Sequence, residues 1–399
     1  MTTRAPKGEG SAFSTPTGYR GYVTVGGKRK YFSAKTKLEL ANKKRVLLNQ
    51  RDNGQLTTGR SPTVLESIDA WLDSSTHRAS TTQGYRFYID HFIGPGIGHI
   101  RLDKLSIDHL TTFYSALGAK GLSGSAVHQC HSILRVALKH ATWRGQVSRN
   151  VAALIQPPTV RNAKQTTFSE GELASLFHEM EGDRYEARWH LALLQGLRPG
   201  ESLGLEWADI DFKARTLSVH QQLQHINGVG LILVHSPKTS SGDRTLFLPK
   251  YLTKLLKTRR NEQRLEKEHA GKNWKPWHFE DEQRDLIFTQ QNGAPTPPRL
   301  DATNWYRLLE AAGLPRTRRY TARHTAASMM ITNNVDVATV SETLGHASPA
   351  FTLSRYVHAV DERKLHMAKR LDTEHERRRI NKVQNKVQST TAQDDRVTE

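Results

Sequence analysis

The stretch WHLALLQGLRPGESLGLEW, residues 189–207, marks a change in the pattern of the chain. In its first half, as in the residues before it, apolar side chains recur at the spacing of an α-helix. Beyond Trp207 the spacing is that of strands, because residues 217–223 and 231–234 flank the turn dipeptide Asn227-Gly228 and residues 245–248 form a further strand. We therefore expect residues 165–375 to form a mainly α-helical domain with a small antiparallel β-sheet.

The residues before this domain predict a second domain, made of helices. Thr63-x-x-Glu66 has the pattern of a capping box, which opens a helix. The clearest helix is residues 125–144, with an apolar stripe of Val127, Cys130, Leu134, Ala137, Leu138 and Ala141. A polar linker at about 156–167 contains Pro157-Pro158 and ends the helical pattern. We expect an all-α domain at residues 61–156, with Arg135 and Lys139 on its basic surface.

A small module is predicted at residues 1–56. Residues 19–25 are strand-like, Gly26-Gly27 supplies a turn, and Lys28, Arg29 and Lys30 begin the return strand. A helix at about 37–51 should follow, with Leu38, Ala41 and Val46 or Leu47 facing this hairpin. The three basic residues suit a DNA groove, although a charged edge that prevents sheet aggregation is the alternative.

Charge and cysteine content restrict the class of protein. The 399 residues include 58 lysines and arginines against 39 acidic residues, which gives a net charge of +19. Such a balance favours a nucleic-acid partner over a merely basic or ribosome-associated protein. Cys130, the single cysteine, excludes an intramolecular disulfide, and its place in an apolar stripe indicates core packing with His128 and His131 rather than a metal site. Without a signal peptide or a bilayer-spanning apolar run, we expect a cytoplasmic protein.

Three segments of the last domain carry arginine, histidine and tyrosine in a fixed order. They are Gly196-Leu197-Arg198-Pro199-Gly200-Glu201, then Tyr320-Thr321-Ala322-Arg323-His324, then Leu344-Gly345-His346 with Tyr356 ten residues later. This combination strongly resembles the tyrosine recombinases, also called the phage integrase family, whose signature is an arginine before Gly-Glu, a His-x-x-Arg box, Leu-Gly-His and a nucleophilic tyrosine. The resemblance extends over about residues 61–375.

The resemblance implies a role for each residue. Arg198 and Arg323 match the two catalytic arginines, Lys238 the catalytic lysine, His346 the later histidine, and Tyr356 the nucleophile. Tyr320 stands where the family's box usually has histidine. Because a phenol is a far weaker base than imidazole at neutral pH, we expect Tyr320 to position the phosphate rather than to deprotonate the nucleophile.

This set suits attack on a phosphodiester. Two arginines can grip the non-bridging oxygens with forked, always-charged donors, so we expect no metal and no other cofactor. The tyrosine must lose its proton as it attacks, and by resemblance the product is a 3′-phosphotyrosine. Lys238 would protonate the departing 5′ oxygen, and His346 would hydrogen-bond the phosphate. Glu201, one helical turn past Arg198, either orients this arginine or is a surface carboxylate.

The resemblance further implies site-specific recombination of phage or mobile-element DNA by a homotetramer bound to double-stranded attachment sites. The module at 1–56 resembles the arm-site binding domain of three-domain integrases. A host DNA-bending protein or a directionality factor is a candidate further partner, and we expect the enzyme at the nucleoid of a bacterial cell, away from membranes. Residues 376–399 form a charged tail. The rival classes are a type IB topoisomerase, which relaxes supercoils, and a DNA-binding protein with a decayed catalytic domain.

Overall fold

The structure, a computed structural model, describes residues 10–25, 28–52, 60–156, 166–235 and 243–357. The chain divides into two compact units, Met1–Ala163 and Lys164–Glu399. Lys238, the charged tail and most of the expected linker at 156–167 lie outside the described residues. The finer limits at 1–56, 61–156 and 165–375 stay predictions. Within the described ranges, no helix is both long enough and apolar enough to cross a membrane.

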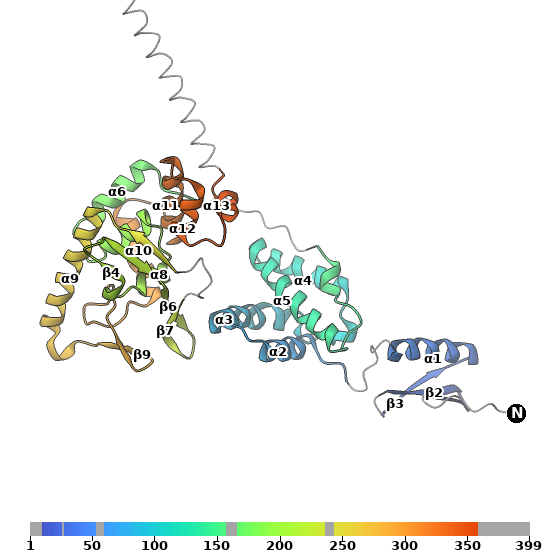
Figure 1. Ribbon diagram of the computed structural model, residues 1–399. Helices are drawn as coiled ribbons and strands as arrows, with labels where there is room; N and C mark the ends of the chain where they lie inside the picture. The colour runs from blue at the N-terminus through green and yellow to red at the C-terminus, as the bar shows by residue number, and fades with distance from the viewer. Residues whose placement is uncertain (1–9, 26–27, 53–59, 157–165, 236–242, 358–399) are drawn as a thin grey trace, which may run out of the picture. The chain divides into compact units, whose positions relative to one another are not determined.

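The first residues form a three-stranded antiparallel sheet of β1 (Ser11–Thr15), β2 (Gly18–Val25) and β3 (Lys28–Ala34), in that order. Helix α1 (Lys37–Asp52) lies along this sheet (Figure 1). The predicted two-stranded hairpin was therefore incomplete. β1 is an edge strand with mostly exposed side chains, so its sequence shows no apolar alternation, and backbone pairing with β2 holds it in place.

The predicted buried face of α1 is also wrong. Leu38 is 73% exposed and Ala41 and Val46 are exposed as well, whereas Leu40 is buried and Leu47 half-buried. The buried face passes through Lys44, which is half-buried. A lysine stem can cover apolar surface while its charge stays in water, so a polar residue interrupts the apolar stripe that the sequence pattern relies on.

The helical part of the first unit comprises α2 (Val64–Ser74), α3 (Ala79–Tyr88), a π-helix (Ile89–Gly98), α4 (Ile107–Ala119) and α5 (Gly124–Trp143). Thr63 and Glu66 form the predicted capping box at the start of α2. The six residues of the predicted apolar stripe, Cys130 among them, are buried on α5 in one hydrophobic cluster. Local sequence patterns therefore predicted the start of α2 and the buried stripe of α5 correctly, because α5 buries one continuous apolar face, whereas α3 has no buried residue.

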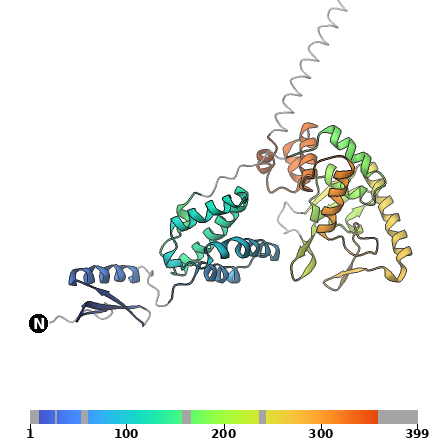
Figure 2. The same cartoon turned by 180° about the vertical axis from the view of Figure 1, so that it is seen from behind.

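The second unit is helix-rich, with small antiparallel sheets (Figures 1 and 2). Its helices are α6 (Glu170–Met180), α7 (Glu186–Leu194), α8 (Pro199–Leu203), α9 (Lys250–Ala270), α10 (Pro298–Ala311), α11 (Tyr320–Thr332), α12 (Val337–Leu344) and α13 (Pro349–Arg355). Its strands are β4 (Ile210–Asp211), β5 (Thr216–Val219), β6 (Gln221–Ile226), β7 (Gly230–His235), β8 (Arg244–Phe247), β9 (Trp277–Phe279) and β10 (Glu282–Arg284). Both views show α11, α12 and α13 gathered at one end of this unit.

The sheets differ from the prediction in two respects, the first being that β4, β9 and β10 were not predicted. The expected strand at 217–223 is two strands, because the chain changes sheets at His220. β5 pairs with β4 and β8, whereas β6 pairs with β7 across the predicted Asn227-Gly228 turn. The residues at 217, 219, 221 and 223 are all buried, so every second side chain is buried through both strands. The sequence pattern therefore gives no sign of the change of sheet at His220. The register sets Arg244, the first residue of β8, opposite Val219.

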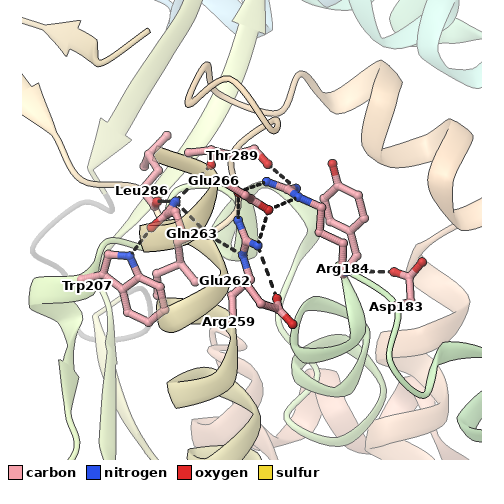
Figure 3. Close-up of polar contacts among 11 residues, drawn as sticks. Asp183, Arg184, Trp207, Arg259, Glu262, Gln263, Glu266, Leu286 and Thr289 are labelled. Atoms are coloured by element: carbon pink, nitrogen blue, oxygen red, sulfur yellow. Dashed lines mark hydrogen bonds and ion pairs between the residues drawn. The ribbon is translucent and has the colours of Figure 1, made fainter. Parts of the chain in front are cut away.

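A buried polar cluster fastens α9 to the rest of the unit (Figure 3). Glu266 accepts hydrogen bonds from Arg184 Nε at 2.6 Å and Arg259 Nη1 at 2.9 Å. Burial would raise the pKa of Glu266, but the hydrogen bonds from the two arginines lower it. Gln263, on the same helix, accepts from the indole nitrogen of Trp207 at 2.6 Å. These contacts join α9 to the segment before α7 and to Trp207.

Candidate active site

Arg198 lies at the N-cap of α8, where Pro199 occupies the first turn of the helix. Its backbone nitrogen donates to Glu201 Oε2 at 2.8 Å, and its Nη1 donates to Oε1 at 2.5 Å. Glu201 also accepts from Arg244, with Nη2 at 2.8 Å from Oε2. Arg244 Nε donates in turn to the carbonyl of Thr343 at 2.7 Å. The buried carboxylate therefore holds two arginines that come from different elements.

Arg323, on α11, is 3% exposed and donates to two backbone carbonyls. Its Nη1 is 2.6 Å from the oxygen of Gly196, and its Nη2 is 2.5 Å from that of Leu344. Gly196 needs to be glycine, since its φ is +67° and an added Cβ would lie 2.4 Å from a Leu344 methyl group. Arg198 Nη2 donates to the next carbonyl, that of Gly345, at 2.8 Å. Both arginines thus converge on the turn that ends α12.

Tyr356 follows α13 directly and is 1% exposed. It packs in an apolar cluster with Ile331, Val340 and Leu344. Its hydroxyl lies 2.8 Å from Nδ1 of His324, one residue beyond Arg323. His346 stacks nearly parallel to the Tyr356 ring, at 6.5 Å between centroids. The phenol is therefore enclosed by α11, α12 and the turn after α12.

His346 hydrogen-bonds Thr352 Oγ1 through Nδ1 at 2.7 Å. With Arg244 and Gly345, His346 also lines an open hollow of about 680 Å³ between the β5–β8 pair and the start of α13. That volume is sufficient for a phosphodiester. A ligand in the hollow would meet the imidazole of His346 and the edge of the arginine cluster.

The electrostatics of this site favour an anion. Arg198 and Arg244 share the single carboxylate of Glu201, and Arg323 donates only to backbone carbonyls, so the cluster carries an excess of two positive charges. Burial would raise the pKa of Glu201, but the hydrogen bond and charge of Arg244, with the charge of Arg198, lower it to about 2. Burial and the neighbouring charge of Arg198 lower the pKa of Arg323 to about 10. Glu201 and Arg323 are therefore both charged at neutral pH.

The histidines and the tyrosine are neutral under the same conditions. Burial, with the charges of Arg323, Arg198 and Arg244, lowers the pKa of His346 to about 3. Burial, with the charges of Arg323 and Arg355, lowers the pKa of His324 to about 4. Burial raises the pKa of Tyr356 above its ordinary value of 10.0. The tyrosine accordingly needs help to lose its proton at neutral pH.

The structure brings most of the predicted residues together. Arg198, Glu201, Arg323, His346 and Tyr356 all lie around the turn after α12. Lys238 falls outside the described residues. Tyr320, at the first position of α11, is 48% exposed, and its ring is 6.5 Å from that of His324. The catalytic roles of these residues stay predictions.

The predicted DNA-binding side chains are exposed where the structure describes them. Arg29 and Lys30 lie on β3, and the Arg29 guanidinium stacks 4.5 Å above the Tyr22 ring; the side chain of Lys28 is outside the described part. Arg135 and Lys139 are exposed on α5. Their role in DNA binding is still to be tested.

Two residues of the site were missed in the sequence. Arg244 was left out of the strand expected at 245–248, although it shares the buried parity of Leu246 on β8, and an arginine on an inward face is a usable signal. His324 was named only as the last residue of the second segment, one helical turn beyond Tyr320, and was given no role. A helical wheel sets it on the same face of the helix as Tyr320, but could not have shown that Tyr356 lies there.

The sequence is similar to those of known integrases and recombinases. The family model described as the phage integrase family matches residues 167–363. An integrase of Saccharopolyspora erythraea is 27% identical over 93% of this chain and 98% of its own length. A tyrosine recombinase XerC-like protein of Caldanaerobacter subterraneus subsp. tengcongensis is 28% identical over 89% of this chain and 95% of its own.

Solved structures show the same fold. The Tn1549 transposon integrase, in complex with a circular intermediate DNA, has a TM-score of 0.67 at 20% identity and covers 77% of this chain and 99% of its own. A lambda integrase tetramer bound to a Holliday junction has a TM-score of 0.54 at 15% identity over 90% of this chain and 97% of its own. This protein is an enzyme of the site-specific DNA recombinase class. Residues 167–363 form a domain of the phage integrase family, the tyrosine recombinases, and the relatives that match most of the chain are an integrase and a tyrosine recombinase XerC-like protein.

Proposed function

We propose that this protein recombines phage or other mobile-element DNA at specific sites by cutting and rejoining strands through a 3′-phosphotyrosine on Tyr356. The convergence of this tyrosine with two arginines carries the proposal. Arg198 and Arg323 donate to successive carbonyls of the turn after α12, and Tyr356 packs against Leu344 of the same turn. A phosphate bound by the arginines would therefore lie near the phenol.

Each residue then has a distinct role. Arg198 and Arg323 bind the non-bridging oxygens, on which negative charge builds up during attack. His346 hydrogen-bonds the phosphate, and Lys238 protonates the departing 5′ oxygen. Glu201 fixes Arg198, and Tyr320, exposed at the start of α11, contacts the phosphate backbone. Because the phosphotyrosine stores the energy of the broken bond, a 5′-hydroxyl can reverse the step without ATP.

The test is Tyr356→Phe on a nicked core-site substrate that traps the cleaved product. We expect undiminished core-site binding and no covalent protein–DNA adduct, because only the hydroxyl is removed. An adduct at wild-type yield on a denaturing gel would disprove the proposal. Plasmids that lack a core site serve as the matched control: relaxation of their supercoils would indicate a topoisomerase instead.

DNA binding would extend beyond the catalytic domain. We assign the sheet at the N-terminus to arm-type sites, supported by the exposed Arg29 and Lys30 beside Tyr22 and Tyr31. Arg135 and Lys139 on α5 would contact the core site. Deletion of residues 1–56 should remove one class of footprint and leave core-site cleavage measurable. Unchanged footprints at every site would exclude the arm-site assignment.

The active assembly would be a homotetramer on two double-stranded attachment sites, in the cytoplasm and at the nucleoid of a bacterial cell. A DNA-bending host protein or a directionality factor would assist. The tetramer of lambda integrase on a Holliday junction supports this stoichiometry. Sedimentation with and without paired core sites would test it, and a complex that stays monomeric on DNA while recombining would contradict it.

A further inference from the structure

We propose that His324 is a catalytic residue, which holds the hydroxyl of Tyr356 in the resting enzyme and takes its proton during strand cleavage. This inference rests on the proposed function of Tyr356 as the nucleophile. It gives a role to a histidine outside the recombinase signature described above. It also supplies the proton acceptor that Tyr320 cannot be.

The geometry of the pair carries the inference. His324 Nδ1 and the Tyr356 hydroxyl oxygen are 2.8 Å apart, within the range that general base catalysis requires. The two rings come from different elements, α11 and the end of α13, with centroids 5.9 Å apart and planes inclined at 57°. The hydroxyl is buried, so the imidazole rather than bulk water receives its hydrogen bond.

The other candidates for this role are placed less well. Tyr320, at the usual position of the histidine in the box, is exposed, and its phenol would be a weak base. His346 already uses Nδ1 for Thr352, and its ring lies parallel to that of Tyr356 at 6.5 Å. Of the predicted acid-base residues that the structure describes, neither reaches the nucleophile as His324 does.

The charges around His324 provide a switch that depends on DNA. Arg323 on its own helix and Arg355 on α13 act on it from two sides, with Tyr320, His346 and Tyr356 as its titratable neighbours. In the free protein these positive charges and burial lower the pKa of His324 to about 4, so it is a neutral acceptor. A bound phosphate would offset the charge of Arg323 and raise this pKa toward its ordinary value near 6.5. The imidazole would thus become a stronger base once DNA is bound.

Strand cleavage exchanges one bond at phosphorus and moves two protons. The Tyr356 oxygen forms a bond to phosphorus while its proton moves to His324 Nδ1, which becomes an imidazolium. The bond from phosphorus to the 5′ oxygen breaks, and that oxygen takes a proton from Lys238. Rejoining runs the same transfers backwards, with the imidazolium returning the proton to the leaving phenolate.

The experiment compares single-turnover cleavage of a nicked core-site substrate by wild type and His324→Gln in the full chain. Glutamine can still hydrogen-bond the hydroxyl but cannot accept its proton. We expect about a hundredfold slower adduct formation with unchanged DNA affinity, as for loss of a general base. The wild-type rate should fall on acidification as His324 becomes protonated. This acid limb of the pH–rate profile should be absent from the variant. His178→Gln, at an exposed position on α6, controls for the substitution itself and should cleave like wild type.

A second variant separates chemistry from folding. His324→Ala leaves room beside the phenol, so added imidazole should restore part of its cleavage rate, whereas a purely structural histidine would not respond in this way. Cleavage by His324→Gln within a few-fold of wild type, with the acid limb retained, would overturn the inference. If Tyr356→Phe formed adduct as well, the nucleophile would be elsewhere and the proposed function would fall instead.

Discussion

The core of the helical region around α5 and the core around Tyr356 are both well buried, but they are built from different side chains. From Val64 to Ala152 the helical cluster consists of apolar residues, with few buried polar side chains such as Ser67 and His131 beside them. The second unit instead buries Arg188, Glu201, Arg244, Arg259, Asp301 and Arg323.

The difference follows from what each core has to do. Apolar contacts have no direction, so the helical core needs only the correct volume and pattern. Buried charges must be paired in good geometry, since an unpaired one is costly. The second unit accepts this cost around Arg198 and Arg323 because a site for a phosphodiester needs cationic donors fixed before the substrate arrives. The second core should therefore respond far more sharply to conservative changes.

The largest effect should come from the two arginines. Arg198→Ala and Arg323→Ala should each slow cleavage by about a hundredfold or more, because each removes a transition-state donor. Arg323→Ala should in addition lower the free energy of unfolding by about 3 kcal/mol, since it leaves the Gly196 and Leu344 carbonyls without their charged donor. Single-turnover cleavage and urea unfolding measure the two effects. If both variants lost the same free energy of unfolding, the additional loss expected for the buried Arg323 would be contradicted.

Matched conservative changes in the two cores should differ next. Asp301→Asn keeps the shape but removes the carboxylate that pairs with the buried Arg188 and with Arg319, so we expect a loss of about 3–5 kcal/mol. Leu134→Met, in the helical core, conserves volume and should cost less than about 1.5 kcal/mol. Hydrogen exchange reports unfolding region by region, so it measures the two losses of stability separately. A larger loss for Leu134→Met would break the comparison.

Acidification should destabilise the catalytic core. The pKa values of His324 and His346 are lowered to about 4 and about 3, whereas in the unfolded chain both titrate near 6.5. Between these values the unfolded state binds more protons, so stability is full above pH 6.5 and falls as the pH drops toward 4. Below about pH 4.5, Glu201 adds to the loss, because its pKa is lowered to about 2. Urea midpoints from pH 7.5 to 4 should show a shallower decline for His346→Gln, and an identical slope would contradict this account.

The smallest effect should come from Tyr320. Its ring is exposed, so Tyr320→Phe should unfold like wild type and lose only a few-fold in cleavage rate through the missing hydroxyl contact. Tyr320→His should retain activity or gain it. A loss as large as that of Arg198→Ala would place Tyr320 among the residues on which the reaction depends.

Much of this molecule could be predicted from the sequence where the information is local. The capping box at Thr63 and the buried stripe of α5 depend on residues within a few turns of one another, so spacing alone identified them. The order of Arg198, Arg323 and Tyr356 indicated the family through resemblance. Local patterns failed for β1, whose edge position leaves it without alternation, and for α1, where Lys44 interrupts the buried face.

Only the tertiary structure decided which groups meet at the site. Arg244 lies 43 residues from Glu201, and His324 lies 32 residues from Tyr356. No spacing rule connects such pairs, because the packing of separate elements sets the direction of each side chain. The sequence thus determined the kinds of group available for phosphoryl transfer. The fold determined that Arg244 joins Arg198 as the second partner of Glu201. It also determined that His324 rather than Tyr320 faces the phenol. A hydrogen bond needs its two atoms within about 3 Å, and only packing can bring them there.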